Sequence, residues 1–317
     1  MNNADEPLSQ AATLIAANPG LIRGVGPFRL SHQVGAGGMG VVYRGEDPRT
    51  GRAVAIKLLR SDHGGQAHRE RFMREASALA RLRHPAIVEY IDHGTTEDGR
   101  DYLVMEWLGG TTLEAEIRRT RLGVTACIAL ATRITAALAA AHAQGLVHRD
   151  IKPSNIILPD GDMDQAKLVD FGIARERGAQ HLLTATGVML GTLGYMAPEQ
   201  ACGDPDIDGR ADLFALGSVL YECLTGEAAF AGEHPMAVLA KILLDNIPDV
   251  RLLRPEVPPA LASLLARLLA KRPEDRPESA EIVGVALAAL AHDPGTESVS
   301  SPSGLTLQEQ RFSSVAL

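Results

Sequence analysis

One stretch of eight residues near the middle of the chain constrains it more than any other feature. Residues 148–155 read His-Arg-Asp-Ile-Lys-Pro-Ser-Asn, and an Asp-Phe-Gly motif begins fifteen residues after Asn155. The carboxylate of Asp150 can orient an attacking hydroxyl and accept its proton, and the ammonium of Lys152 can steady a phosphate in transfer. Asn155 and Asp170 offer hard oxygen ligands that suit magnesium. A polar turn would explain one such group, but the whole order predicts a site for phosphoryl transfer.

A glycine-rich stretch precedes this site in the chain. Residues 35–42 read Gly-Ala-Gly-Gly-Met-Gly-Val-Val. Glycines let the backbone amides of a hairpin loop approach phosphates closely, because no β-carbon intervenes. Dinucleotide-binding folds share this spacing, but they need a helix to open at the last glycine, whereas here residues 41–43 continue as a strand. Gly-Lys-Ser/Thr occurs nowhere in the chain, which excludes a P-loop. The stretch alone is weak evidence for a phosphate-binding loop.

A lysine on the next predicted strand needs a carboxylate partner. Alternation along residues 54–59 places Ala55 and Lys57 on one face, where a small residue admits an adenine ring and a cation meets phosphates. In the predicted helix 66–82, the spacing of the apolar residues puts Glu75 on their stripe. A carboxylate that faces a core is paired or costly. Glu75 therefore either pairs with a cation or reaches water at the edge of the helix.

In order and spacing, these motifs resemble those of a eukaryotic-type serine/threonine protein kinase of the kind found in bacteria, from about Phe28 to about Leu290. The resemblance implies an α+β, bilobal protein-kinase fold. Its N-lobe, about residues 28–105, would be antiparallel and β-rich with one key helix. A hinge at about 106–110 would lead to a mostly helical C-lobe at about 111–291. The implied reaction transfers the γ-phosphoryl group of ATP to serine or threonine of a protein substrate, with Mg²⁺ or Mn²⁺ as the metal.

The resemblance also implies where the nucleotide binds. It assigns Glu75 to Lys57 as its partner, and it makes the hinge backbone the part that hydrogen-bonds adenine, with Met105 as the gatekeeper. Trp107 stands where bacterial relatives more usually have tyrosine, and a buried core aromatic is an equally good interpretation of it. The residues expected around the nucleotide are Val34, Gly35, Gly37, Gly38, Gly40, Val42, Ala55, Lys57, Glu75, Met105, Glu106, Leu108 and Ile157.

A long connection follows the Asp-Phe-Gly motif. It runs from Ile173 to Ala197, and a connection of this length in a compact domain suggests function or mobility. By the resemblance it is an activation segment. Thr192 would then bridge Asp150 and Lys152, as in serine/threonine rather than tyrosine kinases.

Arg149, directly before Asp150, carries a guanidinium that seeks an anion. Thr184 and Thr186 lie upstream of Thr192 at the spacing seen in bacterial relatives. A phosphate on either would add about two negative charges that Arg149 could receive, which would order the segment. We expect self-phosphorylation at one or both threonines, through a transient homodimer. By position alone, ordinary loop threonines are an equally good interpretation.

Four residues are expected to hold the C-lobe in shape: His148, Glu199, Asp212 and Arg276. Asp212 opens a stretch that is apolar nearly all round, which predicts a central helix. It either caps that helix or, by the resemblance, accepts hydrogen bonds from the backbone of His148 and Arg149, and both roles can hold together. The resemblance also pairs Arg276 with Glu199 of the Ala-Pro-Glu motif. Without the resemblance, the preferred interpretation of Arg276 would be a solvent-exposed member of a run of charged residues.

Composition narrows the partners and the compartment. The net charge of −8 argues against a nucleic-acid partner. The three cysteines are scattered, form no metal or disulfide framework, and favour a reducing compartment. The N-terminus has no basic residue before Arg23, unlike a signal peptide. The longest apolar run, 124–147, is interrupted by Arg133 and His142, so no membrane span is expected and we predict a cytoplasmic protein.

The ends of the chain and two rival functions complete these expectations. Residues 1–27 are predicted to be a flexible lead-in, and residues 292–317 a linker or tail, or the start of a further domain. A pseudokinase that serves as a nucleotide-binding scaffold would usually lack the equivalents of Lys57, Asp150 or Asp170. A small-molecule phosphotransferase of similar fold would lack the Ala-Pro-Glu segment and its paired arginine. The sequence retains all of these features.

Overall fold

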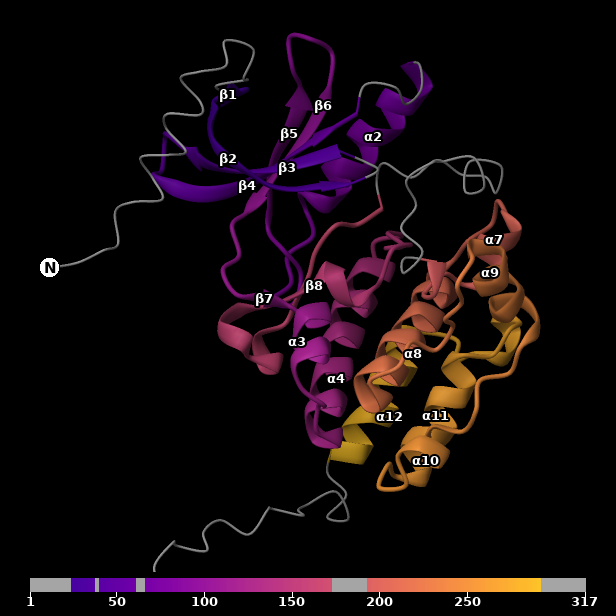
Figure 1. Ribbon diagram of the computed structural model, residues 1–317. Coiled ribbons are helices and arrows are strands. Elements are labelled where there is room, and N and C mark those ends of the chain that lie inside the picture. The colour runs from indigo at the N-terminus through magenta and orange to yellow at the C-terminus, as the bar shows by residue number, and fades with distance from the viewer. Residues whose placement is uncertain (1–23, 38–39, 61–65, 173–192, 292–317) are drawn as a thin grey trace, which may run out of the picture.

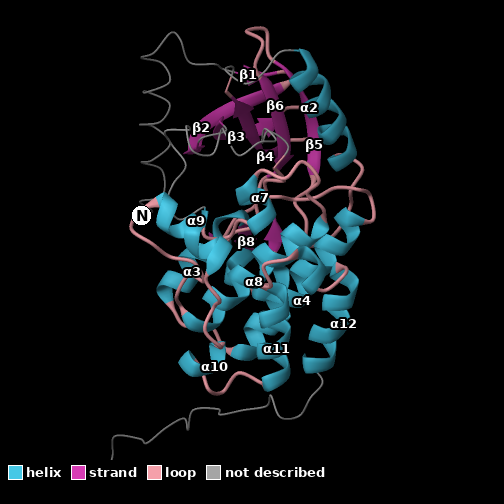
Figure 2. Ribbon diagram, turned by 90° about the vertical axis from the view of Figure 1, so that its right-hand side faces the viewer, coloured by secondary structure: helices cyan, strands magenta, loops and turns pink. Residues whose placement is uncertain are grey.

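Two lobes of different composition make up the protein (Figure 1). The computed structural model describes residues 24–37, 40–60, 66–172 and 193–291. The smaller lobe holds one sheet and a helix, and the larger lobe is mostly helical, as Figure 2 shows from a second side. The predicted α+β, bilobal architecture is confirmed.

The small lobe is an antiparallel sheet with one helix packed against it. The sheet has six strands in the order β1-β2-β3-β4-β6-β5. Helix α2 (Gln66–Leu79) packs against β5. The strands are β1 (Gly24–Val25), β2 (Phe28–Gly37), β3 (Gly40–Asp47), β4 (Arg52–Leu59), β5 (Tyr90–Thr95) and β6 (Asp101–Glu106).

The two faces of this sheet pack in different directions, because side chains alternate along each strand. Val54 and Ile56 of β4 lie in a small apolar cluster on the outer face. Ala55, between them, packs with Met105 toward the main core, which the large lobe shares. Alternation therefore turns Lys57 to the same side as Ala55, toward the large lobe. This is the arrangement that the sequence predicts for the two residues.

The large lobe joins a small sheet to a bundle of helices. The sheet has the order β7-β8-β9. Its strands are β7 (Thr111–Thr112), β8 (Ile156–Leu158) and β9 (Lys167–Leu168). The α-helices are α3 (Leu113–Arg119), α4 (Val124–His142), α7 (Pro198–Cys202), α8 (Gly209–Thr225), α9 (Pro235–Leu244), α10 (Val250–Leu253), α11 (Pro259–Leu268) and α12 (Ala280–Ala291). Short 3₁₀ turns are η1 (Pro153–Asn155), η2 (Pro159–Gly161), η3 (Met163–Gln165) and η4 (Pro273–Asp275).

Helix α8 is the centre of the large lobe. It is buried continuously from Ala211 to Tyr221, which confirms the prediction of a central helix that is apolar nearly all round. Gly217 permits a close approach of α11, because a β-carbon there would lie 2.9 Å from the β-carbon of Leu268. A larger residue at this position would separate α8 from α11.

Helix α4 is long and apolar enough, by length and composition, to cross a membrane, although Arg133 interrupts its apolar sequence. Half of the helix is buried inside the large lobe, where it packs against α8 and α12. Arg133, in its middle, donates to the carbonyls of Ala166 at 2.7 Å and Pro85 at 3.0 Å. The core helix of a soluble protein has these properties too, so its composition is weak evidence for a membrane span.

The boundaries differ from the predicted ones at two places. The small lobe begins before Phe28, because Val25 is 1% exposed and pairs with Phe28 in the sheet. A strand of two residues, such as β1, carries too little periodicity to be recognised in a sequence. Helix α2 ends at Leu79, three residues earlier than predicted. Residues 292–317, for which a linker or a further domain is predicted, lie outside the described residues.

Candidate active site

The loop that carries Asp150 is held by one buried carboxylate. Asp212, in the first turn of α8 and 1% exposed, accepts from the backbone N–H of His148 at 2.8 Å and of Arg149 at 2.7 Å. The Nε2 atom of His142, at the end of α4, lies 2.8 Å from the same carboxylate. The anchoring role expected of Asp212 is confirmed. The capping role is wrong, because the helix begins earlier and Asp208 accepts from the N–H of Arg210 as its N-cap.

The His148 ring connects this loop to the Asp-Phe-Gly turn. Its Nε2 lies 3.0 Å from the carbonyl oxygen of Val169, and its Nδ1 accepts from the N–H of Asp150 at 3.2 Å. Burial lowers the pKa of His148, so a neutral ring with its proton on Nε2 fits both bonds. The ring also packs against Phe171 with 4.5 Å between centroids. The His148 ring thus fixes the spacing between the 148–155 stretch and the Asp-Phe-Gly motif.

Three side chains of the 148–155 stretch meet at one oxygen. Lys152 Nζ lies 3.2 Å from Asp150 Oδ2, and Asn155 Nδ2 donates to that oxygen at 3.1 Å. Asn155 Nδ2 also donates to the Asp150 carbonyl at 2.8 Å. These contacts fix the orientation of the Asp150 carboxylate, whose side chain is 10% exposed. Residues 150, 152 and 155 are therefore brought together as the sequence predicts.

Asp170 lies beside this group and pairs with the strand lysine. The N–H of Val169 donates to the carbonyl of Asn155 at 2.9 Å, which holds the two motifs side by side. Asp170 has a φ of 58°, in the left-handed region that aspartate tolerates better than most residues. Its Oδ2 lies 3.0 Å from Lys57 Nζ. The positive charge of Lys57 is thus balanced inside the site.

The expected ion pair between Lys57 and Glu75 is not formed. Among the described residues, the carboxylate at ion-pair distance from Lys57 is that of Asp170. Glu75 lies half-buried on α2 and has another interaction partner. A mostly buried ammonium takes the nearest carboxylate, and the turn at Asp170 brings its carboxylate there. The rotation of α2 about its own axis, which decides whether Glu75 reaches Lys57, is not encoded in a local motif.

The donor set fits a hard divalent cation. Because Asn155 Nδ2 donates twice to Asp150, the amide oxygen Oδ1 is the atom left for a metal. Asp170 supplies a carboxylate that is 30% exposed. Within the described ranges, no group of three or more His, Cys, Asp or Glu side chains gathers as a metal site. Two oxygen donors suit magnesium, which commonly takes one or two protein ligands and completes its shell with water and phosphate.

Four of the residues predicted around the nucleotide share one face of the sheet. Val42 is paired with Lys57 across β3 and β4, and Ala55 is paired with Met105 across β4 and β6. At the start of β3, a β-carbon on Gly40 would lie 2.2 Å from the carbonyl oxygen of Leu58, so only glycine fits. The remaining members lie at these positions: Val34, Gly35 and Gly37 on β2, Glu106 at the end of β6, Leu108 just after it, and Ile157 on β8.

Four predicted residues lie outside the described part of the chain: Gly38, Thr184, Thr186 and Thr192. Their roles remain predictions from the sequence.

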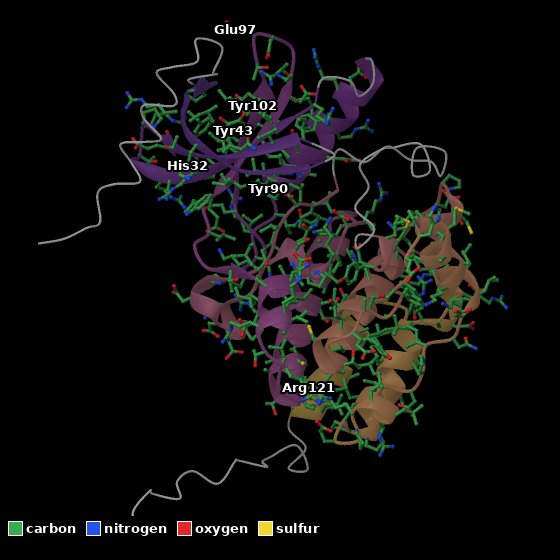
Figure 3. The ribbon with its side chains drawn as sticks, viewed as in Figure 1. His32, Tyr43, Tyr90, Glu97, Tyr102 and Arg121 are labelled. Atoms are coloured by element: carbon green, nitrogen blue, oxygen red, sulfur yellow. The ribbon has the colours of Figure 1, made fainter. Side chains whose placement is uncertain are left out.

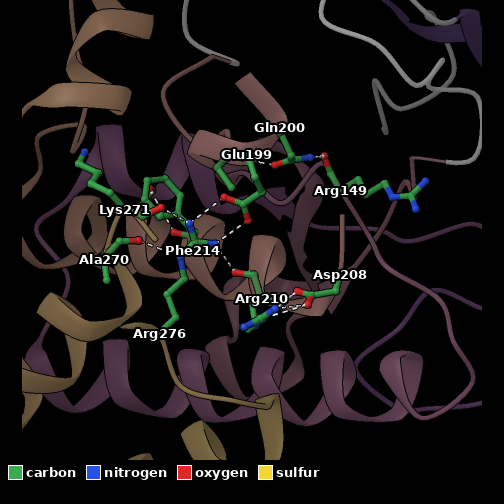
Figure 4. A network of polar contacts seen from close by, with 11 residues as sticks. Arg149, Glu199, Gln200, Asp208, Arg210, Phe214, Ala270, Lys271 and Arg276 are labelled. Atoms are coloured by element: carbon green, nitrogen blue, oxygen red, sulfur yellow. Dashed lines mark hydrogen bonds and ion pairs between the residues drawn. The ribbon is translucent and has the colours of Figure 1, made fainter. Parts of the chain in front are cut away.

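A buried ion pair joins the Ala-Pro-Glu motif to the far end of the large lobe (Figure 4). Arg276 donates to both carboxylate oxygens of Glu199, at 2.6 and 2.8 Å. It also donates to the carbonyls of Ala270, Lys271 and Arg210, and its side chain is 0% exposed. The pairing of Arg276 with Glu199 is confirmed, and a solvated charge run is excluded.

No sequence pattern predicts the contact between Gln200 and the loop that carries Asp150. The side chain of Gln200 accepts from the N–H of Ala197 at 3.0 Å and donates to the carbonyl of Arg149 at 3.1 Å (Figure 4). The end of the Ala-Pro-Glu segment is therefore bonded to the residue before Asp150. A glutamine at the start of a helix gives no signal of this kind in the sequence.

The sequence also does not predict the contacts that hold the side chain of Glu106, at the start of the hinge. Lys167 Nζ lies 2.5 Å from Glu106 Oε1, and the N–H of Glu89 donates to the same oxygen at 2.9 Å. Tyr90, next to Glu89, lies at the junction of the lobes (Figure 3). Burial and the nearby Asp170 raise the pKa of Tyr90 well above its usual value, so its hydroxyl stays neutral. These partners are far apart in the chain and follow no local pattern.

The fold and this site define the class of protein. The sequence pattern of the protein kinase domain matches residues 28–287. The chain is 42% identical over 276 residues to the serine/threonine-protein kinase PknD of Mycobacterium tuberculosis, which covers 86% of this chain and 40% of PknD. It is 42% identical over 254 residues to Pkn1 of Myxococcus xanthus, covering 79% of this chain and 36% of Pkn1.

Solved structures agree with these relatives. The kinase domain of M. tuberculosis PknI matches with a TM-score of 0.66 at 28% identity, over 85% of this chain and 98% of that domain. The chain therefore belongs to the protein kinase family, and its relatives named above are bacterial serine/threonine-protein kinases. The match spans about two fifths of the length of PknD.

Proposed function

We propose that this protein transfers the γ-phosphoryl group of ATP to serine or threonine hydroxyls of proteins. The observation that carries the proposal is the convergence of Lys152 and Asn155 on the carboxylate of Asp150, beside the paired Asp170 and Lys57. These neighbouring side chains can serve as a base, as cations and as hard oxygen ligands, which supports the proposal. Phosphoryl transfer depends mainly on such positioning and charge neutralisation.

Each residue then has a defined part. Asp150 orients the substrate hydroxyl and accepts its proton, and Lys152 steadies the γ-phosphate. Lys57 binds the α- and β-phosphates, and the glycine-rich β2–β3 turn covers them. The backbone of Glu106 and Leu108 in the hinge hydrogen-bonds adenine. The ring then lies between Ala55 of the small lobe and Ile157 of the large lobe. Thr192 is proposed to bridge Asp150 and Lys152.

Asn155 and Asp170 would hold magnesium, with manganese as an alternative. When bound, the metal neutralises phosphate charge as it develops in the transfer. The ammonium of Lys57 then has phosphates as alternative partners to Asp170. A pseudokinase scaffold is the second candidate, but the intact Asp150 cluster favours turnover.

Incubation with ATP, magnesium and a mixed set of serine- and threonine-containing peptides tests the proposal. We expect phosphate on peptide hydroxyls, which mass spectrometry would locate. Nucleotide binding in calorimetry without phosphate transfer to peptide or to the protein itself would instead support the scaffold.

The metal ligands can be tested by a conservative change. Asp170→Asn keeps the shape of the side chain and tolerates the left-handed backbone at this position, but it removes the negative charge that a hard cation prefers. The increase in Tm that magnesium adds to the effect of ATP should disappear. Asp164→Asn, on an exposed turn, is the matched control and should retain it. An unchanged magnesium effect in the first variant would exclude Asp170 as a ligand.

Regulation by the activation segment is part of the proposal. A phosphate on Thr184 or Thr186 would be received by Arg149, whose backbone is fixed by Asp212 and Gln200. The phosphate would come from a second copy of the chain in a transient homodimer. We propose a cytoplasmic location, which the cysteine usage favours.

The double variant Thr184→Ala/Thr186→Ala should phosphorylate an external peptide more slowly than the wild type, by about tenfold, because the charge that orders the segment is lost. Its Tm should remain close to that of the wild type. Equal activity of the two proteins, or phosphates mapped only outside residues 173–197, would refute this form of regulation.

A further inference from the structure

The hinge carries the single tryptophan of the chain, and an arginine lies over its ring. The Arg44 guanidinium carbon is 5.0 Å from the centroid of the Trp107 ring. Within the described residues, the side chain of Arg44 forms no hydrogen bond or ion pair, so this ring is the partner of its charge. Trp107 lies between Glu106 and Leu108, and it is half-buried rather than part of the core.

The strand register shows which side of the sheet this pair occupies. Arg44 is paired with Ala55 across β3 and β4, and Ala55 packs toward the large lobe. Tyr43, the neighbour of Arg44 in sequence (Figure 3), packs against the outer cluster instead. Arg44 therefore projects on the same face as Val42 and Ala55, two residues that line the proposed adenine site.

We infer that Arg44 and Trp107 close the outer edge of the adenine site, with Arg44 as the positioning residue that holds the indole in place. This inference rests on the proposed ATP site. Guanidinium groups bind tryptophan faces more favourably than other rings. The pair therefore pre-organises a flat apolar wall beside the hinge, where a purine loses contact with water. It also keeps a positive charge near the mouth of a site for an anionic nucleotide.

Two measurable consequences follow from the position of the indole. Binding of ADP or ATP should shift Trp107 emission to shorter wavelength, because the ring loses contact with water. Arg44→Met keeps the length of the side chain and removes its charge. It should shift emission of the free protein to longer wavelength and weaken nucleotide binding about two- to five-fold. Because the pair lies away from Asp150, kcat should change little while KM for ATP rises.

The experiment combines emission spectra with calorimetry, using magnesium–ADP as the titrant. Arg29→Met is the matched control, because Arg29 is an exposed arginine on the same sheet, paired across strands with Glu46 and not with the hinge. Arg44→Lys should restore part of the affinity. In a Trp107→Ala background, Arg44→Met should have little further effect on affinity, since the two residues act as one unit.

The outcomes separate this inference from the proposed function. Calorimetric binding with unchanged Trp107 emission would overturn the inference alone, as would equal affinities and spectra for the Arg44→Met and Arg29→Met variants. An additive effect of the two changes in the double variant would also overturn it. No binding of nucleotide to the wild type would overturn the proposed function and this inference together.

Discussion

Asp150→Asn should lower the rate of phosphoryl transfer by about a hundredfold to ten-thousandfold while ATP affinity stays nearly unchanged. The amide has almost the same shape as the carboxylate and can still accept from Lys152 and Asn155, the two side chains that meet at Oδ2. It cannot accept the proton of the substrate hydroxyl, and it removes a negative charge beside Lys152. The loss should therefore appear in kcat, whereas the KM for ATP should change little.

Initial rates of peptide phosphorylation, measured against ATP concentration, would show this division. Asp162→Asn changes an exposed aspartate on a turn of the same lobe and serves as the control. A near wild-type kcat for Asp150→Asn would remove Asp150 from the role of base. A large loss of ATP affinity with unchanged kcat would make it a binding residue instead.

Arg276→Met should destabilise the large lobe by about 3 to 5 kcal/mol, because it leaves the carboxylate of Glu199 buried without its cation. The side chain of Arg276 is 0% exposed and that of Glu199 is 10% exposed, so solvent cannot replace the lost bonds. The substitution also leaves three carbonyl oxygens without their donor. For a domain of this size, Tm should fall by roughly 6 to 20 °C.

Thermal unfolding of four proteins would test this: the wild type, Arg276→Met, Glu199→Gln and the double variant. The double variant should be less destabilised than the sum of the single ones, because removing both partners leaves no unpaired buried charge. Arg272→Met, which breaks an exposed pair with Glu274, is the control and should change stability by less than about 1 kcal/mol. Similar losses for Arg276→Met and Arg272→Met would contradict the structural role of Arg276.

The residues of one loop carry the part of the site that the sequence predicts without help from the resemblance. Asp150, Lys152 and Asn155 lie within six residues of one another, so their meeting follows from a single tight turn, η1. The anchoring of that loop by Asp212, and the pairing of Glu199 with Arg276, follow from the resemblance to a family with a shared fold. In both cases the structure has the expected contacts.

The parts that the sequence does not predict depend on how separate elements are placed in space. The partner of Lys57 changes from Glu75 to Asp170 according to the orientation of α2, which no local pattern encodes. Lys167 of β9 and Glu106 of β6 meet although 61 residues separate them in the chain. Arg44 and Trp107 meet because β3 and the end of β6 lie on opposite sides of β4, and their side chains are long enough to reach across it. Such pairs require the packed structure.

The central claim, that this site transfers phosphate to serine or threonine, is tested most directly by intact-mass and peptide-mapping mass spectrometry. The wild type and Asp150→Asn would each be incubated with ATP and magnesium. The account predicts phosphoryl groups on serine or threonine of the wild type, and none above background on Asp150→Asn that binds ATP with normal affinity. A wild type that binds ATP with magnesium and acquires no phosphate, on itself or on any peptide, would contradict it, as would equal phosphorylation of the two proteins.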